Sequence, residues 1–351
     1  MRTLRLLVTA ALAVVFMLIA NGAWAQDGSE AMSRAGAHLV LSLDADEVRA
    51  YWLTSMRDEI RGRLREAKVG FGGLALVDNA LQVRLSKPED AEAALRALGD
   101  LAPAAPIGML ERFLAVMRGS LGSDIRVAKG EGGSITIAPT ERGLERRTSA
   151  ALDNTLAIVT RRLDEIGLAA SAVRRGRDQI YVHAPGLQDT SALKDLLTKP
   201  ARLGFHEVHA AIGVEQARQG RMPTGFRIYR ATSGELLLRE IPIMQGSDLA
   251  DAHAAIDQRT NEPIITFRFN NTGAHAFARY TAEHIGRPFA IVLDDLVLSA
   301  PVIREPILGG SGQISGNFTM DDARRLAVQL RSGTLPAKLA VVMERVVPAA
   351  Q

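Results

Sequence analysis

The chain has 351 residues, with 42 lysines and arginines against 39 aspartates and glutamates, so its formal net charge is only +3. So small a charge gives no electrostatic indication of nucleic-acid binding. The sequence contains no cysteine, which excludes disulfide bonds, thiol nucleophiles and cysteine-ligated metals. A hydrophobic content of 47% over this length can form a large core and predicts two domains, or one domain that carries an insertion.

The N-terminus has the three parts of an export signal. Arg2 and Arg5 precede an apolar stretch at residues 6–20, and Ala23-Trp24-Ala25 then forms a small-x-small cleavage motif. We therefore expect residues 1–25 to be a signal peptide that is removed after Ala25. The alternative is an uncleaved membrane anchor through residues 6–20, although a free-standing span needs about 20 apolar residues.

An internal repeat follows the signal. Leu64-Arg65-Glu66 and Leu163-Asp164-Glu165 each end a helical pattern, and each precedes a glycine-containing connection and a pair of strands. Leu81-Gln82-Val83 and Ile180-Tyr181-Val182 form the same strand in the two copies. Two further strands lead the copies, at residues 39–43 and 124–127. The pattern predicts two βαβ-type units that share one antiparallel sheet, a ferredoxin-like base.

Residues 103–117 form an insertion within the repeat. After an Ala- and Pro-rich start, apolar residues recur at helical spacing: Ile107, Leu110, Phe113, Leu114 and Met117. We expect a surface helix packed on the base. A peripheral membrane helix or a partner-docking helix is the alternative.

The second half of the chain changes character. Residues 211–235 are polar and aperiodic, which predicts a loop or a domain junction. A third α/β unit is expected after it, with strands at 241–244 and 263–269, helices at 247–257 and 272–285, and a hairpin over 290–298 whose turn is Asp294-Asp295. Thr319 stands three residues before Asp322 and predicts a capped helix that Gly333 ends. A final strand at 338–342 is expected to return to the base.

Four motifs are specific enough to indicate a family. They are Pro-Gly-Leu-Gln-Asp-Thr at 185–190, Ser-Ala-Pro-Val-Ile at 299–303, Gly-Gly-Ser-Gly-Gln-Ile-Ser-Gly at 309–316 and Leu-Arg-Ser-Gly-Thr-Leu-Pro at 330–336. With them the chain resembles the first periplasmic domain of SecD, a subunit of the bacterial Sec translocation machinery. The resemblance implies an α+β fold, with a ferredoxin-like base of duplicated βαβ-type units and an inserted α/β head subdomain.

The resemblance also divides the chain. It implies a base formed by residues 36–205 plus 336–347 and a head formed by residues 206–335. The family's motif near the membrane is altered here at residues 33–38, and the sequence ends soon after Val347, where the family continues into a membrane half with its proton pathway. We therefore expect a stand-alone domain without a proton-driven motor of its own.

Other chemistry has little support in the sequence. His206-Glu207-Val208-His209 reads as a strand, in which residues three apart point to opposite faces, unlike the helical spacing of a zinc motif. The glycines at 309–316 lack the Gly-Lys-Ser/Thr ending of a phosphate loop, and Ser299 lacks a Gly-x-Ser-x-Gly elbow. Arg174-Arg175-Arg177 fits a hairpin turn, without the exposed aromatic motif of RNA-binding sheets. We expect no enzyme activity, no metal or cofactor site and no nucleic-acid partner.

Polypeptide binding is the function that remains. An open sheet edge can pair with an extended chain, and a mobile apolar loop can hold unfolded segments. The candidate residues are Ser299, Ala300, Pro301, Val302, Gly309, Gly310, Ser311, Gly312, Gln313 and Ile314. The resemblance implies unfolded or secreted polypeptide as the ligand and Sec translocon components as further partners, in the periplasm or anchored in the inner membrane facing it. A non-catalytic envelope adaptor, which keeps the fold but not polypeptide capture, is the alternative.

Overall fold

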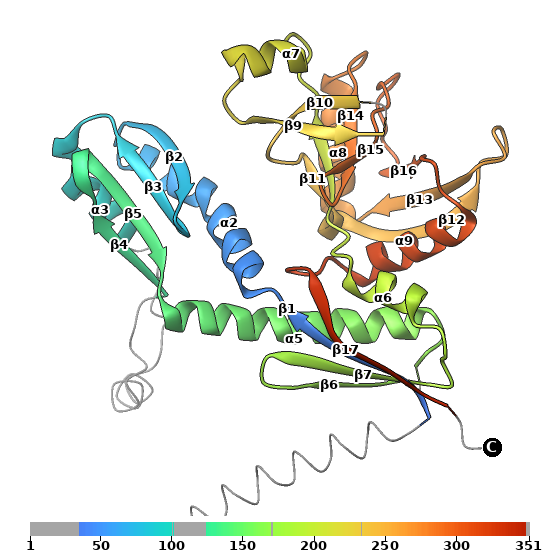
Figure 1. Ribbon diagram of the computed structural model, residues 1–351. Coiled ribbons are helices and arrows are strands. Elements are labelled where there is room, and N and C mark those ends of the chain that lie inside the picture. The colour runs from blue at the N-terminus through green and yellow to red at the C-terminus, as the bar shows by residue number, and fades with distance from the viewer. Residues whose placement is uncertain (1–34, 100, 102–123, 170, 233, 349–351) are drawn as a thin grey trace, which may run out of the picture.

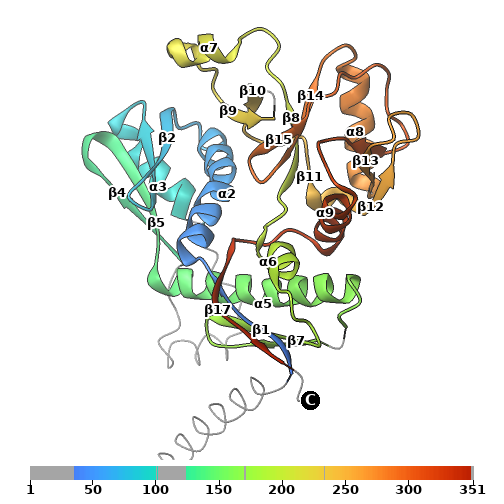
Figure 2. The same cartoon turned by 45° about the vertical axis from the view of Figure 1, so that its right-hand side comes forward.

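The computed structural model describes residues 35–99, 101, 124–169, 171–232 and 234–348 (Figure 1). The expected signal peptide or anchor and the expected helix at 103–117 lie outside these residues. The described chain mixes helices with several separate sheets, which confirms the α+β fold class. It forms a base sheet with a long helix, a small lobe on one side, and a head above the other end of that helix (Figures 1 and 2).

The base sheet joins the first and last strands of the described chain. Across the sheet the strands are β17 (Leu339–Val347), β1 (Gly36–Leu43), β7 (Gln179–Pro185) and β6 (Ala172–Arg175), all antiparallel. Apolar residues of helices α5 (Glu141–Glu165) and α6 (Ser191–Thr198) pack against it. Leu39 and Leu41 alternate with the outward side chains of β1 and form the centre of this core.

The small lobe has its own sheet and its own core. Its strands are β2 (Phe71–Val77), β3 (Ala80–Leu85), β5 (Ser134–Pro139) and β4 (Ile125–Lys129), in that order. Helices α2 (Ala45–Glu66) and α3 (Ala91–Gly99) cover it, and Ile60, Leu81 and Ile137 are fully buried between the layers. The expectation of one shared sheet for the two repeat copies is therefore wrong.

The two copies instead exchange their leading strands. β1 leads the first copy but pairs with β7 of the second. The strand expected at 124–127 to lead the second copy is β4, which pairs with β5, and β5 in turn pairs with β3 of the first copy. Helix length explains the exchange. At about 1.5 Å per residue, the 22 residues of α2 and the 25 residues of α5 each span more than about 30 Å, so each helix carries the chain from one sheet to the other.

Both long helices begin at a side-chain cap. The Asp44 carboxylate accepts hydrogen bonds from the backbone N–H groups of Asp46 and Glu47. The Thr140 hydroxyl accepts one from Gly143 N at 3.1 Å. These caps fix where the chain turns from strand to helix in each copy.

The head contains two sheets and two main helices. The larger sheet has the strand order β10 (Gly234–Arg239), β9 (Phe226–Ala231), β15 (Leu296–Ser299), β14 (Phe289–Leu293), β8 (Leu203–Glu207), β11 (Met244–Gln245). The smaller sheet has the order β12 (Leu249–Ile256), β13 (Pro263–Phe269), β16 (Ser311–Ile314). The helices are α8 (Asn271–Glu283) and α9 (Met320–Ser332). Phe205 forms the centre of the core, with four phenylalanine ring centroids at 5.1–6.3 Å from its own.

Short helical turns complete the chain: η1 (Pro88–Asp90), η2 (Glu131–Gly133), α7 (Val214–Gln216), η3 (Ala217–Arg221) and η4 (Gly246–Asp248).

Several expected elements of the head are confirmed and two are wrong, and the strand expected at 241–244 is only the two-residue strand β11. The hairpin over 290–298, the helix at 272–285 and the Thr319 capping box are present as β14–β15, α8 and the start of α9. The helix expected at 247–257 is strand β12, because pairing with β13 and packing under α9 override the helix propensity of its alanines. The loop expected at 211–235 includes β9 and the start of β10, which pair with each other as a hairpin, and β9 also pairs with the distant strand β15.

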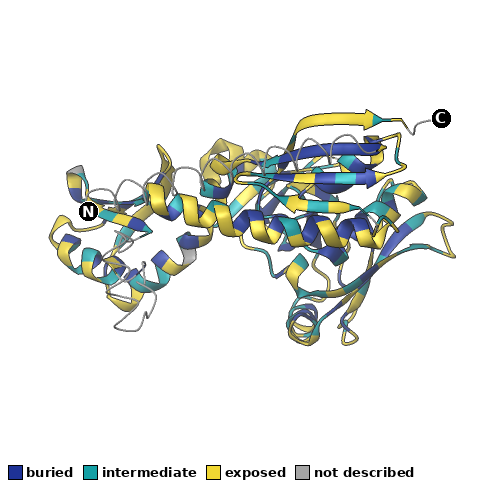
Figure 3. Cartoon of the chain, turned by 90° about the horizontal axis from the view of Figure 1, so that it is seen from below, coloured by how far each residue is buried: buried dark blue, intermediate teal, exposed yellow. Residues whose placement is uncertain are grey.

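The edge strand β17 differs in exposure from its neighbour. Seen from below, β17 is mostly exposed, whereas β1 beside it is buried (Figure 3). A bulge interrupts their pairing between Val40 and Leu41. Such bulges are a common device for protecting sheet edges from unwanted pairing.

Candidate functional site

The ten candidate residues lie on two separate surfaces of the head. Ser299 ends β15, and residues 300–302 continue beyond it at one end of the larger sheet. Ser311 to Ile314 form β16, the edge strand of the smaller sheet. The sequence therefore identified two segments, which the structure holds in different environments.

The first surface lies where the connection after α8 meets the segment that follows β15. Its exposed apolar residues are Ile285, Pro301, Val302 and Leu308, and we call them the tip patch. The exposed fractions are 52% for Ile285, 54% for Val302 and 76% for Leu308, large values for apolar side chains. Pro301 is also exposed. Exposed apolar side chains on neighbouring segments are a feature expected of a protein-binding surface.

Backbone hydrogen bonds hold the segments of the tip patch together. Gly286 N donates to Ile303 O at 2.8 Å, and Ile303 N donates to Arg287 O at 3.0 Å. The buried Thr281 hydroxyl of α8 accepts from Ile307 N at 3.0 Å. The apolar side chains are therefore presented by a fixed backbone.

The glycines before and within β16 are required by close packing. A Cβ on Gly310 would lie 2.5 Å from Ala274 Cβ of α8, and Gly310 has a φ of +59°. A Cβ on Gly312 would lie 2.6 Å from the ring of Phe267 on the neighbouring strand. Residues 311–314 are a paired strand where a mobile loop or a bulged strand was expected, and these two glycines allow that strand to pack.

The second surface is a hollow on the open face of the smaller sheet, which we call the sheet hollow. Its volume is about 520 Å³. The lining residues are Asp251, His253, Thr266, Phe267, Arg268, Ser311, Gly312 and Gln313. Three of the ten candidate residues, from β16, thus lie beside charged residues that the sequence did not identify.

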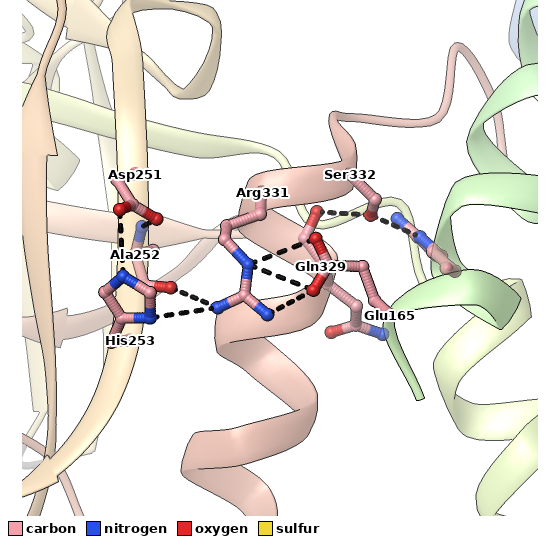
Figure 4. Close-up of polar contacts among 8 residues, drawn as sticks. Glu165, Asp251, Ala252, His253, Gln329, Arg331 and Ser332 are labelled. Carbon is pink, nitrogen blue, oxygen red and sulfur yellow. Dashed lines mark hydrogen bonds and ion pairs between the residues drawn. The ribbon is translucent and has the colours of Figure 1, made fainter. Parts of the chain in front are cut away.

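A polar network connects the sheet hollow to the base (Figure 4). His253 Nε2 lies 2.8 Å from Asp251 Oδ2, and His253 Nδ1 lies 3.4 Å from Arg331 Nη1. Arg331 also donates to Glu165 Oε2 at 2.5 Å and to Ala252 O at 2.5 Å. Since Glu165 ends α5, Arg331 links strand β12 of the head to the long helix of the base.

The charges of this network shift the pKa values of its acids. The hydrogen bond from Arg331 lowers the pKa of Glu165 below its ordinary value of 4.5. The hydrogen bond with His253 lowers the pKa of Asp251. Both carboxylates are therefore ionised at neutral pH, and Arg331 retains an anionic partner in the base.

A fully buried arginine fixes the two crossings between base and head. Arg162 of α5 donates to Leu196 O at 2.6 Å and Lys199 O at 2.8 Å before the first crossing. It also donates to Ser332 Oγ at 3.2 Å and to Gly333 O at 3.3 Å before the return crossing. Burial lowers the pKa of Arg162 to about 10, which still leaves it charged at neutral pH.

The acidic turn contributes to the same joint. Asp294 and Asp295 have φ values of +48° and +69°, which confirms the tight turn. The Asp294 carboxylate also accepts hydrogen bonds from the backbone N–H groups of Ala201 and Arg202 at the first crossing. We call this set of contacts at the two crossings, together with Arg162 and Arg331, the joint.

Sequence reasoning missed Arg162 and Arg331. A signal existed for Arg162, because it shares the apolar face of α5 with Ile158 and Val159, where a charged residue is out of place. Arg331 lies in the last turn of a capped helix, and its distant partners leave no local pattern.

The remaining sequence candidates serve structural contacts. His206 Nδ1 lies 2.8 Å from Arg239 O, whereas His209 Nδ1 accepts from Ile212 N at 2.9 Å. Among the described residues no three histidine, aspartate or glutamate side chains gather as metal ligands would. Arg175 forms an ion pair with Asp153 at 2.5 Å.

Comparison with known proteins identifies the architecture that holds these surfaces. The family model of the SecDF P1 head subdomain matches residues 225–337, and that of the N-terminal part of the SecDF P1 domain matches residues 152–210. Protein translocase subunit SecD of Rickettsia bellii is 32% identical over 314 residues, 89% of this chain and 57% of the relative. Over most of its length, the chain is similar to SecD.

Two further known proteins are similar to the chain. SecD of Rhodobacter capsulatus is 32% identical over 90% of this chain and 55% of its own length. A solved SecDF chain, described as a membrane component that enhances protein export, is 30% identical, with 56% of this chain and 94% of that chain covered and a TM-score of 0.46.

The chain spans little more than half the length of the curated relatives it matches. Within the described ranges, no helix combines the length and the apolar character needed to cross a bilayer.

Proposed function

We propose that the chain assists protein export by binding unfolded or translocating polypeptide at the tip patch of its head. The observation that carries the proposal is the exposure of Ile285, Val302 and Leu308 on one hydrogen-bonded framework. Unfolded chains expose apolar side chains in every register, so a small apolar patch can bind many of them without strict sequence preference. Association with Sec translocon components is part of the proposal.

The division of the chain belongs to the same proposal. We assign residues 36–205 plus 336–347 to the base and 206–335 to the head, with one adjustment. β8 begins at Leu203 in the head's larger sheet, so the first crossing precedes the boundary expected at residue 205. A periplasmic location, the cleavage after Ala25, the possible anchor at 6–20 and the lack of a motor of its own stay predictions. N-terminal sequencing of fractionated protein tests the cleavage.

The binding proposal is tested by changing one exposed side chain. Leu308→Asp should weaken binding of a labelled, carboxymethylated and therefore permanently unfolded polypeptide about 10-fold, because it removes about 1.5 kcal/mol of apolar burial. Fluorescence anisotropy with the purified chain measures this affinity.

The matched control is Ile256→Asp, which changes a side chain that is 53% exposed at the end of β12, outside the tip patch. It should leave the affinity within about twofold. Equal losses in both variants, or no binding by the unchanged protein, would refute the proposal.

A further inference from the structure

The open face of the smaller sheet carries two rows of polar side chains. Residues directly opposite each other on antiparallel strands point to the same face. The pairing of β12, β13 and β16 forms one row from His253, Thr266 and Gln313 and a second from Asp251, Arg268 and Ser311. The opposite face is apolar and packs into the head core.

Of the charged side chains in these rows, one has hydrogen-bond partners in the described part of the chain and one has none. The Asp251 carboxylate is engaged by His253 at 2.8 Å and by the N–H of Ala252 at 2.8 Å. The Arg268 side chain is exposed, and among the described residues its guanidinium group has neither a hydrogen bond nor an ion pair. The sheet hollow therefore presents one positive charge that no acid of the described chain neutralises.

The strand beside Arg268 can accept another strand. β16 is the edge of its sheet, and within the described ranges it pairs on one side only, with β13. Its exposed residues Ser311 and Gln313 are polar and Gly312 has no side chain, so little bulk obstructs an approaching backbone. An extended chain beside β16 could place its own side chains within reach of Arg268.

We propose that the sheet hollow binds an extended stretch of polypeptide along β16 and that Arg268 pairs with an aspartate or glutamate of that stretch. The inference rests on the proposed function, because the ligand is the same polypeptide that the tip patch binds through apolar contacts. The inference adds an ionic contact to the apolar one, and this ionic contact favours acidic segments of the polypeptide.

Arg331 and Glu165 act as positioning residues for this surface. Arg331 donates to Ala252 O and lies against His253 Nδ1, so it holds the β12 side of the sheet hollow in place. With Nδ1 accepting from Arg331, the Nε2–H group of His253 donates to Asp251. This arrangement keeps Asp251 engaged and leaves Arg268 as the available charge.

The test uses two labelled peptides that differ at one residue. Both are unstructured, about 12 residues long and identical except for a central Glu or Gln. The purified full chain should bind the Glu peptide about three- to fivefold more tightly, the range of an exposed ion pair, and 0.5 M salt should reduce the preference. Arg268→Gln should abolish the preference and leave the affinity for the Gln peptide unchanged.

Two further variants make the result specific. Arg268→Lys keeps the charge and should retain part of the preference, whereas Arg259→Gln, an exposed arginine of the β12–β13 connection, should leave it intact. Because the chain has no cysteine, Gln313→Cys should crosslink to a thiol-reactive peptide, whereas Met222→Cys, at another exposed position of the head, should not.

The outcomes separate the two proposals. If both peptides bind equally well and Leu308→Asp weakens both, the inference fails and the proposed function stands. If neither peptide nor the unfolded polypeptide binds, both fail. If Arg268→Gln weakens the binding of both peptides equally, Arg268 does not distinguish the acidic residue from glutamine, and the inference fails.

Discussion

The joint and the tip patch use their side chains in opposite ways. At the joint, the fully buried Arg162 has its donors engaged by backbone carbonyls and a hydroxyl from both crossings. At the tip patch, Val302 and Leu308 leave more than half of their surface in water. The polar groups of the joint bind other groups of the same chain, whereas the apolar side chains of the tip patch stay free to contact another chain. This difference is expected between a rigid support and a binding surface.

The largest effect should come from the joint. Arg162→Met should lower the free energy of unfolding by about 3–4 kcal/mol, because the carbonyls of Leu196, Lys199 and Gly333 would stay buried without their donor. Urea denaturation followed by circular dichroism measures the change. Arg304→Met, an exposed arginine of the head, is the matched control and should stay within about 0.5 kcal/mol. If the two variants were equally stable, the buried hydrogen bonds of Arg162 would not stabilise the joint, and the contrast with the tip patch would be contradicted.

A substitution in the tip patch should affect polypeptide binding but not stability. Leu308→Asp should change the unfolding free energy by no more than about 0.5 kcal/mol, since the side chain is 76% exposed, while lowering polypeptide affinity. The same denaturation experiment supplies the measurement. A large loss of stability would mean that Leu308 belongs to the core of the head.

A smaller effect on stability than that of Arg162→Met concerns the ion pair between Arg331 and Glu165, and it depends on pH. The pKa of Glu165 is lowered in the folded state, so its stabilisation is present above the unfolded value of about 4.5 and is lost as the pH falls through the folded value. Glu165→Gln should therefore cost about 0.5–1 kcal/mol at pH 7 and almost nothing near pH 3. Unfolding free energies of both proteins measured from pH 3 to pH 7 test this. A difference that is constant over the whole range would contradict the ion pair.

Local patterns predicted much of the fold and little of the joint. The Thr319 capping box, the Asp294-Asp295 turn and the helix ends at Glu66 and Glu165 are set by neighbours in the sequence, and all are present. The exchange of leading strands could not be predicted, because the repeat defines each unit but not which copy each strand pairs with. Strand β12 was missed for a related reason, since its pairing and the packing of α9 decide its conformation.

The binding surfaces were located only in part. The motifs that indicate the family contain Val302 and β16, so both segments were identified from the sequence. Ile285 and Arg268 lie outside those motifs and join the surfaces through tertiary structure. Sequence alone also could not show that Gly310 and Gly312 serve packing, because Ala274 and Phe267 are distant in the chain.

Crosslinking in living cells tests the central claim most directly. A photoreactive residue is placed at position 308 of the tip patch and, as a control, at Ile166, an exposed apolar residue at the end of α5 in the base. Polypeptide capture predicts that position 308 crosslinks to many different polypeptides in transit and that position 166 does not. Crosslinks from position 308 to one constant folded partner would indicate an envelope adaptor, and that result would contradict the account.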